Sequence, residues 1–207
     1  MTSAALNLQA PRYGAANAVQ RAATRFQVDA GLIAAILADE AARWDMADTL
    51  QNVLMKVLVT LSPRPAGRLQ RFAAWLTRRP LTTHSLGPAQ MKLGTLQEVA
   101  RSGFLPLPAG QQEQIRFLLD PLAAPYLVAA RLRQTLDHWQ AGGIDLSRRP
   151  EILGTLYSLG LTGKGGVHAK PQPSSRGLEI AALAGAYRAA PLKLASRPQP
   201  FQRGATP

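Results

Sequence analysis

The sequence contains no cysteine among its 207 residues. A chain without thiols can form neither a disulfide framework nor a thiolate metal site, and it has no cysteine nucleophile. Its folded state must therefore depend on packing and polar contacts. The three histidines, His84, His138 and His168, lack the spacing of metal ligands, so we expect no metal site and no cofactor.

Aromatic residues are also scarce, at 6% of the chain, and β-branched residues are sparse, whereas Ala, Leu and Arg are abundant. This balance favours helices over pleated sheets. With 46% hydrophobic residues, the chain is long enough to fill one sizeable core. We predict an all-α fold, with one domain over residues 1–190 and a proline- and arginine-containing tail over residues 191–207.

Long apolar runs are missing as well. The longest, over residues 53–61, is interrupted by Lys56 and is far shorter than the roughly 20 residues that a membrane-spanning helix needs. We therefore expect no membrane span. The first residues, Met1 to Tyr13, have neither a basic start nor a continuous apolar stretch, so we expect no secretory signal peptide.

Acidic residues are half as common as basic ones, with 12 Asp and Glu against 24 Lys and Arg, which gives a formal net charge of +12. Such a charge attracts polyanions, including nucleic acids, anionic lipid surfaces and bacterial envelope polymers. A basic helical nucleic-acid-binding module is therefore one alternative. Its candidate phosphate contacts are Arg64, Arg68, Arg71, Arg78 and Arg79. Because basic residues are spread along the whole chain, we expect no specific nucleic-acid partner.

Apolar periodicity and capping residues predict a succession of helices. Asp29 is a natural N-cap for a helix that runs to about Trp44, and Pro125 is a candidate kink in a long helix. Residues 80–88 are expected to form a loop, with at most a small hairpin near residues 81–91. The other expected helices cover residues 15–26, 49–61, 68–79, 95–102, 111–119, 121–140, 150–159 and 178–188.

Glu40 is the first candidate for chemistry, because it falls within the apolar face of the helix that begins after Asp29. The apolar positions between residues 32 and 37 form a stripe, and Glu40 continues it. A carboxyl at the wall of a cleft has a raised pKa, as a general acid requires. The alternative is a structural glutamate paired with Arg43, for which Asp39 competes.

A second pattern lies 45 positions after that glutamate. Residues 85–91, Ser-Leu-Gly-Pro-Ala-Gln-Met, have the form Ser-x-Gly-x-x-Gln-hydrophobic. Alone, this is a common turn sequence. Together with the glutamate it resembles the signature of lytic transglycosylases and goose-type lysozymes, in the lysozyme-like superfamily. The resemblance implies that Gly87 lets the backbone approach the sugar, and that Ser85, Gln90 and Met91 bind the substrate beside the catalytic carboxyl.

Residues 155–160, Thr-Leu-Tyr-Ser-Leu-Gly, supply a third element, which is similar to the Tyr-Asn-x-Gly segment of the same family. The resemblance places the hydroxyl of Tyr157 near the catalytic carboxyl, among the substrate-binding residues. Ser158 stands where the family has Asn, so the role of that amide is not carried over. The alternative is a core tyrosine with one satisfied hydroxyl. From Glu40 to Gly160, the three elements span over half of the chain.

The number of carboxylates bears on the mechanism. A conventional retaining or inverting glycosidase needs two, about 5 to 10 Å apart. One is evident here, because Asp45 and Asp48, just beyond the Glu40 helix, belong to no recognisable motif. The resemblance implies a lytic transglycosylase that cuts the bond between N-acetylmuramic acid and N-acetylglucosamine in peptidoglycan, with Glu40 as its single catalytic acid. A hydrolytic muramidase is the close alternative.

A peptidoglycan substrate implies action in the periplasm or cell wall. With no export signal expected, we predict delivery by a phage lysis or specialised secretion route, as an endolysin or bacteriolytic effector, with room for an immunity or delivery partner. Residues 160–175 are expected to form an extended, flexible loop, in which residues 163–166, Gly-Lys-Gly-Gly, lack the full phosphate-loop pattern. Lys164 and Lys170 on this loop would line the cleft and meet acidic parts of the wall polymer.

Overall fold

The computed structural model describes residues 15–43 and 85–189 of the chain. Of these residues 64% are helical, and the one sheet among them has two short strands. The prediction of a predominantly helical fold is confirmed at this level. The helices expected over residues 49–61 and 68–79, the candidate nucleic-acid-contacting arginines, Asp45, Asp48 and the tail lie outside the described residues.

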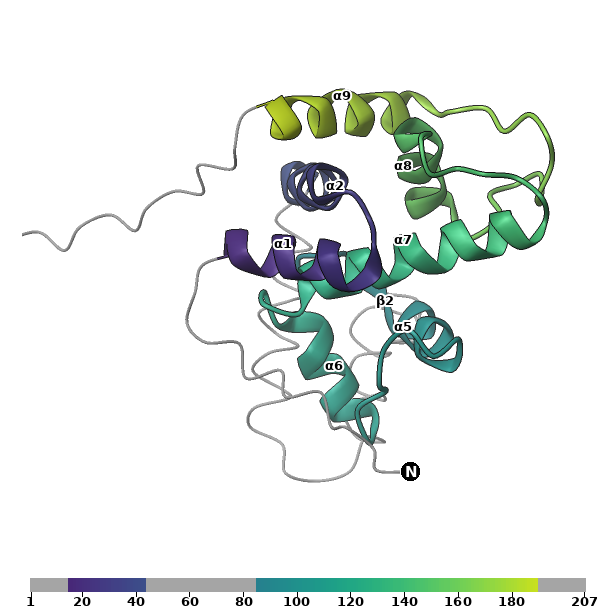
Figure 1. Cartoon of the computed structure of the whole chain (residues 1–207). Helices are drawn as coiled ribbons and strands as arrows, with labels where there is room; N and C mark the ends of the chain where they lie inside the picture. The colour runs from purple at the N-terminus through teal and green to yellow at the C-terminus, as the bar shows by residue number, and fades with distance from the viewer. Residues whose placement is uncertain (1–14, 44–84, 190–207) are drawn as a thin grey trace, which may run out of the picture.

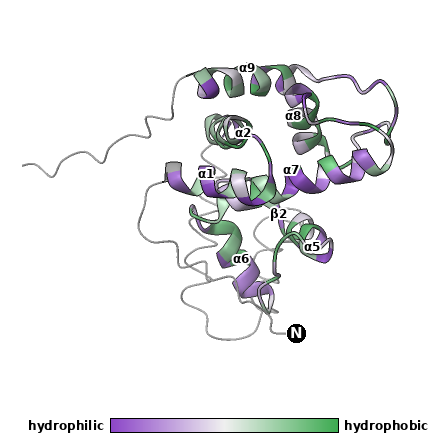
Figure 2. Ribbon diagram, in the orientation of Figure 1, coloured by the Kyte–Doolittle hydropathy of each residue, from purple (hydrophilic) through white to green (hydrophobic). Residues whose placement is uncertain are grey.

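Two helices open the described structure, α1 (Ala15–Phe26) and α2 (Ala30–Ala42). The predicted cap of α2 is confirmed, because the Asp29 carboxylate accepts a hydrogen bond from the Leu32 amide at 2.7 Å. Figure 2 shows α2 as predominantly hydrophobic, and it packs against α1, α7, α8 and α9. A helix contacted on several sides is buried on more than one face, so the stripe predicted from the sequence understates its burial.

The short hairpin consists of β1 (Ser85–Leu86) and β2 (Met91–Lys92), paired antiparallel with Ser85 opposite Lys92. The sequence allowed at most a small hairpin near residues 81–91 and favoured a loop over residues 80–88, but β1 begins within that stretch. The second strand runs directly into α5 (Leu93–Arg101), which therefore begins two residues before the predicted start at residue 95. After a loop, α6 (Gln111–Leu119) follows with the bounds that the sequence predicted.

The longest described helix is α7 (Ala124–Ala141), which begins three residues later than predicted. Pro125 lies in its first turn, where a missing amide hydrogen breaks no helical hydrogen bond. Pro125 therefore lies at the start of α7 and not at a kink within it, as the sequence had suggested.

Two further helices complete the described fold, α8 (Pro150–Leu159) and α9 (Ser175–Ala189). α8 has its predicted bounds, but α9 begins three residues earlier than predicted. The reason is Ser174, whose hydroxyl accepts a hydrogen bond from the Gly177 amide at 3.1 Å and so caps the helix. α9 lies over α2, with α1 and α7 on the opposite side of α2 (Figure 1).

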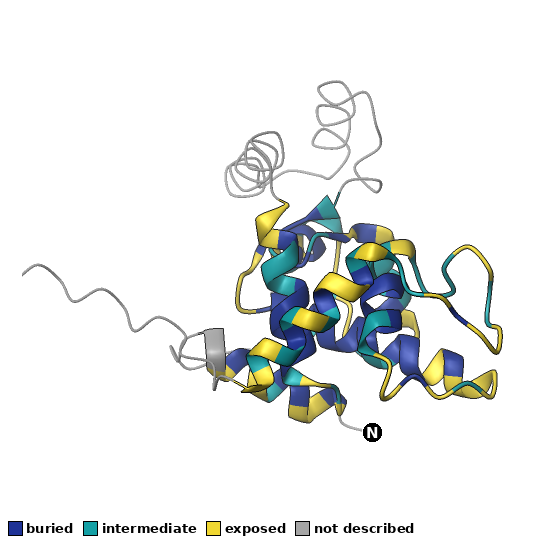
Figure 3. Cartoon of the chain, turned by 90° about the horizontal axis from the view of Figure 1, so that it is seen from above, coloured by how far each residue is buried: buried dark blue, intermediate teal, exposed yellow. Residues whose placement is uncertain are grey.

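The buried hydrophobic residues form a core that includes side chains from every described helix, from α1 to α9. Figure 3 shows the buried faces of the helices turned inward and the exposed faces turned to solvent. Trp139 of α7 is among the largest fully buried side chains, and its indole donates a hydrogen bond to the Leu161 carbonyl at 2.8 Å. Within residues 15–43 and 85–189, no helix combines the length and apolarity needed to cross a bilayer.

Candidate active site

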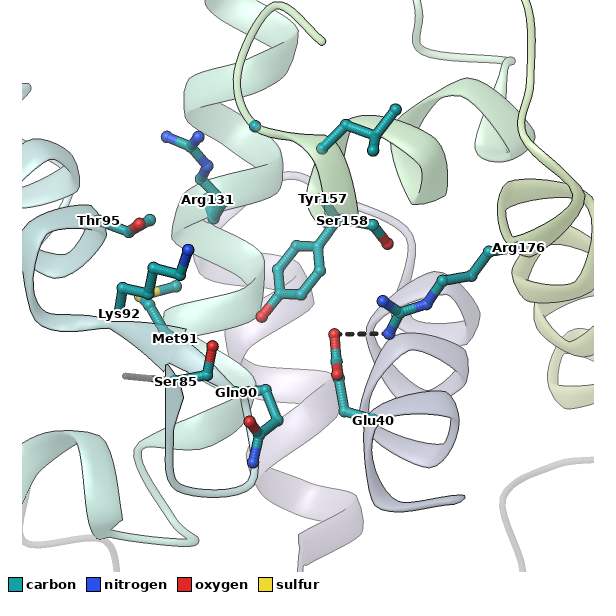
Figure 4. A pocket seen from close by; sticks show the side chains of 12 residues that line it. Glu40, Ser85, Gln90, Met91, Lys92, Thr95, Arg131, Tyr157, Ser158 and Arg176 are labelled. Carbon is teal, nitrogen blue, oxygen red and sulfur yellow. Dashed lines mark ion pairs between the residues drawn. The ribbon is translucent and has the colours of Figure 1, made fainter. Parts of the chain in front are cut away.

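A cleft of about 270 Å³ opens where α2, the hairpin, α5, α7, α8 and α9 converge (Figure 4). Its volume lies just below the roughly 300 to 1,000 Å³ typical of small-molecule sites. Its lining residues are Glu40, Ser85, Gln90, Met91, Lys92, Thr95, Arg131, Tyr157, Ser158, Leu159, Gly160 and Arg176. The structure thus brings together five of the six predicted site residues, and Gly87 is the one that does not line the cleft.

Glu40 lies in the last turn of α2, and its side chain is 11% exposed. Burial raises the pKa of its carboxyl above the ordinary glutamate value, because removal from water disfavours the charged form. The guanidinium of Arg176 opposes this shift, with its Nη2 2.9 Å from Glu40 Oε1, while the neighbouring Asp39 adds to it. The carboxyl therefore keeps its proton to a higher pH than an ordinary glutamate.

The pairing of Glu40 with Arg43, considered from the sequence, is wrong. Arg43 Nε donates instead to Asp39 Oδ1 at 2.9 Å, and Arg43 Nη2 donates to Glu179 Oε2 at 3.0 Å. Asp39 precedes Arg43 by four residues and shares its side of the helix. Of the two acids considered as partners of Arg43, Asp39 is therefore the one that forms the ion pair. Glu40 is left to a partner from another helix.

That partner, Arg176, was missed by the sequence analysis. It lies in the first turn of α9, in a segment that carried no motif. Its Nε donates to Asp39 Oδ2 at 2.7 Å, and its Nη2 lies 2.6 Å from the same oxygen. Sequence patterns report neighbours within a helix, whereas this contact joins residues 137 positions apart.

The turn between β1 and β2 depends on two residues with left-handed backbone, Gly87 at φ 66° and Gln90 at φ 44°. A Cβ on Gly87 would lie 1.8 Å from the Leu118 carbonyl oxygen, so only glycine allows the turn to reach α6 this closely. The close approach that Gly87 permits is therefore to the backbone of α6. Gln90 closes the turn with a backbone hydrogen bond to the Gly87 carbonyl at 2.9 Å.

Tyr157 links α8 to this turn. Its hydroxyl donates a hydrogen bond to the Ala89 carbonyl at 2.7 Å, while the ring faces the cleft between Glu40 and the hairpin (Figure 4). Burial, and then the nearby Glu40 carboxylate, raise the pKa of Tyr157 far above its usual range, so the phenol remains a donor. The hydroxyl thus lies in the electrostatic reach of Glu40 but is bonded to the turn. Ser158, which replaces the family's Asn, donates to the Gly154 carbonyl at 3.3 Å.

The cations of the cleft come from other residues than expected. Lys164 and Lys170 do not line it, which corrects the prediction made for their loop, whereas Lys92 of β2 and Arg131 of α7 do. The Arg131 side chain is 6% exposed, and its Nη1 pairs with Glu98 at 3.0 Å. Of the basic residues lining the cleft besides Arg176, Lys92 is the exposed one.

In the described part of the chain, no group of three His, Asp or Glu side chains is arranged to hold a metal ion. Comparison with protein-family models, with curated proteins and with solved structures gives no match. One carboxyl with a raised pKa faces a polar cleft, which is the requirement for donating a proton to a bound substrate.

Proposed function

We propose that this protein is a peptidoglycan-cleaving glycosidase with a lysozyme-like site, and specifically a lytic transglycosylase in which Glu40 is the catalytic acid. The observation that carries the proposal is the convergence of Glu40, the turn over residues 85–91 and Tyr157 on one cleft. These segments are far apart in the sequence, and together they resemble one family signature. Such an enzyme acts where its substrate is, in the periplasm or cell wall.

In the proposed reaction, Glu40 transfers its proton to the oxygen of the bond between N-acetylmuramic acid and N-acetylglucosamine. The bond from the anomeric carbon to that oxygen breaks, and N-acetylglucosamine leaves with a new hydroxyl. The Glu40 carboxylate then takes the proton from the muramoyl 6-hydroxyl, whose oxygen attacks the anomeric carbon. Glu40 is thereby reprotonated, and the product is a 1,6-anhydro sugar formed without water.

The number of carboxylates favours this route over hydrolysis. Within the described residues, Glu40 is the one acidic side chain that lines the cleft. Asp39 adjoins it but is engaged by Arg43 and Arg176. A two-carboxylate hydrolase needs a second carboxyl across the cleft, about 5 to 10 Å from the first. Asp45 and Asp48, the candidates from the sequence, are tested below because they lie outside the described residues.

The proposal is tested with Glu40→Gln on purified peptidoglycan. Glutamine keeps the volume and the hydrogen-bonding capacity of the side chain but has no carboxyl proton to donate, so turnover should fall by about 10² to 10⁴. Glu179→Gln is the matched control, because Glu179 is a glutamate of α9 whose side chain is 65% exposed and outside the cleft. Wild-type activity in the Glu40→Gln protein would refute the assignment.

Product analysis by mass spectrometry separates the two glycosidase mechanisms. Anhydromuramoyl ends are expected from intramolecular attack, whereas reducing muramoyl ends carrying oxygen from labelled water would establish a muramidase. Asp45→Asn and Asp48→Asn should leave turnover within a few-fold of wild type. If either variant is as inactive as Glu40→Gln, a two-carboxylate hydrolase becomes the better interpretation.

A further inference from the structure

Arg176 is shared by two acids that adjoin in the sequence, but it is not shared equally. Two of its nitrogens, Nε and Nη2, lie 2.7 and 2.6 Å from Asp39 Oδ2. One of them, Nη2, also lies 2.9 Å from Glu40 Oε1 (Figure 4). Of the Arg176 contacts with the two acids, the well-aligned hydrogen bond is the one from Nε to Asp39. Arg176 thus has two nitrogens close to Asp39 and one nitrogen close to Glu40.

This inequality matters because the Glu40 carboxyl must lose that contact when it turns to a substrate or takes up a proton. Leaving a partly buried guanidinium without a partner is strongly unfavourable. Asp39 is placed to prevent this, because its two contacts with Arg176 do not involve the Glu40 carboxyl. Asp39 is itself fixed by Arg43, which occupies its other oxygen at 2.9 Å.

The backbone that carries Arg176 is also held in place. The next residue, Gly177, lies so close to α8 that a Cβ there would be 2.1 Å from Thr155 Oγ1 and 2.2 Å from the Glu151 carbonyl oxygen. The Gly177 amide is bound by Ser174. The first turn of α9 is therefore packed tightly against α8. The Arg176 side chain extends from this turn toward the end of α2.

The other charged groups around Glu40 are distributed over the helices that pack on α2. From α2 itself come Asp39 and Arg43, and α9 adds Glu179, which reaches the group through Arg43. The remaining titratable groups that line the cleft are Tyr157 of α8, Arg131 of α7 and Lys92 of β2, while α1 contributes none. Of the described residues, Arg176 is the one cation in ion-pair contact with Glu40.

We propose that Arg176, held by Asp39, is a positioning residue that aims the Glu40 carboxyl into the cleft and sets the pH range in which Glu40 donates a proton. The inference rests on the proposed function, because it concerns the proton transfer by Glu40. It assigns a role to two residues that the family resemblance does not include. It also predicts that substitutions of Asp39 and Arg176 have effects of opposite sign.

Arg176→Gln removes the cation that favours the ionised form of Glu40. The glutamate then keeps its proton to higher pH. The alkaline limb of the pH profile of kcat/KM, where activity falls as Glu40 ionises, therefore moves to higher pH by about one pH unit or more. Asp39→Asn removes the neighbouring negative charge and the main anchor of Arg176, which is then free to pair with Glu40 alone. Glu40 ionises more easily in that variant, and the alkaline limb moves downward.

Two further variants separate this role from a merely structural one. Arg176→Lys keeps a cation at the site and should return the limb toward its wild-type position. Arg43→Gln removes a partner of Asp39 that does not contact Glu40, so it should lower the melting temperature with a smaller movement of the limb. If all four variants change the melting temperature but leave the limb in place, Arg176 has only a structural role and the inference fails.

A carbon-13 NMR titration of the Glu40 carboxyl in the full chain gives a readout that does not depend on turnover. The inference requires the Glu40 titration to move up in Arg176→Gln and down in Asp39→Asn, together with the corresponding limbs of kcat/KM. Movement in the same direction, or no movement, overturns it. If Glu40→Gln is inactive while the limbs stay fixed, only this inference fails; if Glu40→Gln remains active, the proposed function fails.

Discussion

The cleft has two walls that are held by different forces. The helical wall, made of Glu40 on α2 and Arg176 on α9, is held by the ion pair between them and by the ion pair of Arg176 with Asp39. The turn wall consists of Ser85, Gln90, Met91 and Tyr157. The turn over residues 85–91 that carries it is held by backbone contact with α6 and by the neutral hydrogen bond from Tyr157 to the Ala89 carbonyl. The first wall responds to pH, and the second does not.

This difference suggests a division of labour. Proton transfer needs a group whose charge can change, and its pKa is adjusted by burial and by neighbouring charges. Orienting a substrate needs fixed geometry, which close packing and neutral hydrogen bonds provide over a wide pH range. Perturbing the turn wall should therefore change stability and binding without moving the titration of Glu40, whereas perturbing the helical wall should move that titration.

The largest effect on stability is expected at the turn wall, from Gly87→Ala. An L-residue at φ 66° costs about 1 to 2 kcal/mol, and a Cβ placed 1.8 Å from the Leu118 carbonyl oxygen forces a displacement that adds about 1 to 3 kcal/mol. We expect urea denaturation to give a loss of about 2 to 5 kcal/mol. Gly94→Ala is the matched control, because a Cβ there meets nothing within 4 Å. Equal stability of the two variants would contradict the proposed contact with α6.

The helical wall should show a pH-dependent effect on stability in Glu40→Gln. The folded-state pKa of Glu40 is raised, so its favourable contribution is present below the ordinary glutamate pKa of 4.5 and is lost as the pH rises through the higher folded value. Glutamine does not titrate, so the variant should gain in melting temperature relative to wild type as the pH is raised. A relative loss with rising pH would show that the Arg176 ion pair outweighs burial.

Tyr157→Phe tests whether the turn wall can be weakened without changing the titration of Glu40 on the helical wall. The substitution keeps the ring but removes the hydrogen bond to the Ala89 carbonyl, so we expect a loss of about 1 kcal/mol on denaturation. Activity should fall through weaker substrate binding, because the turn over residues 85–91 is less firmly held. The alkaline limb of kcat/KM should stay in place. A displaced limb would mean that Tyr157 acts on Glu40 directly.

The smallest effect is expected from Lys164→Ala combined with Lys170→Ala. Neither side chain lines the cleft, so both stability and kcat/KM should stay close to wild type, with stability changed by less than about 0.5 kcal/mol. Lys92→Ala is the comparison, because Lys92 does line the cleft. This substitution should raise KM for an acidic wall polymer. A larger effect from the loop lysines than from Lys92 would show that the loop over residues 160–174 closes on the substrate.

Much of the helical wall could be predicted from the sequence, because its elements depend on local interactions. The Asp29 cap and the inward direction of Glu40 follow from capping and from the spacing of apolar residues. The helix after Asp29 was predicted to run to about Trp44 and ends at Ala42. The start of α9 was missed, since Ser174 as its cap lay hidden in a loop rich in prolines and serines. The turn over residues 85–91 was expected as part of a loop, and its two short strands are decided by their pairing in the fold.

The sequence by itself determined which residue types were available for chemistry, and it indicated that Glu40 points inward. Only the tertiary structure decided its electrostatic partner, because Arg176 reaches Glu40 by the packing of α9 on α2, and no local periodicity reports a contact across 136 positions. The same holds for Gly87. Its place in a turn is legible from neighbouring residues, whereas the need for glycine arises from the Leu118 carbonyl, which folding alone brings within reach.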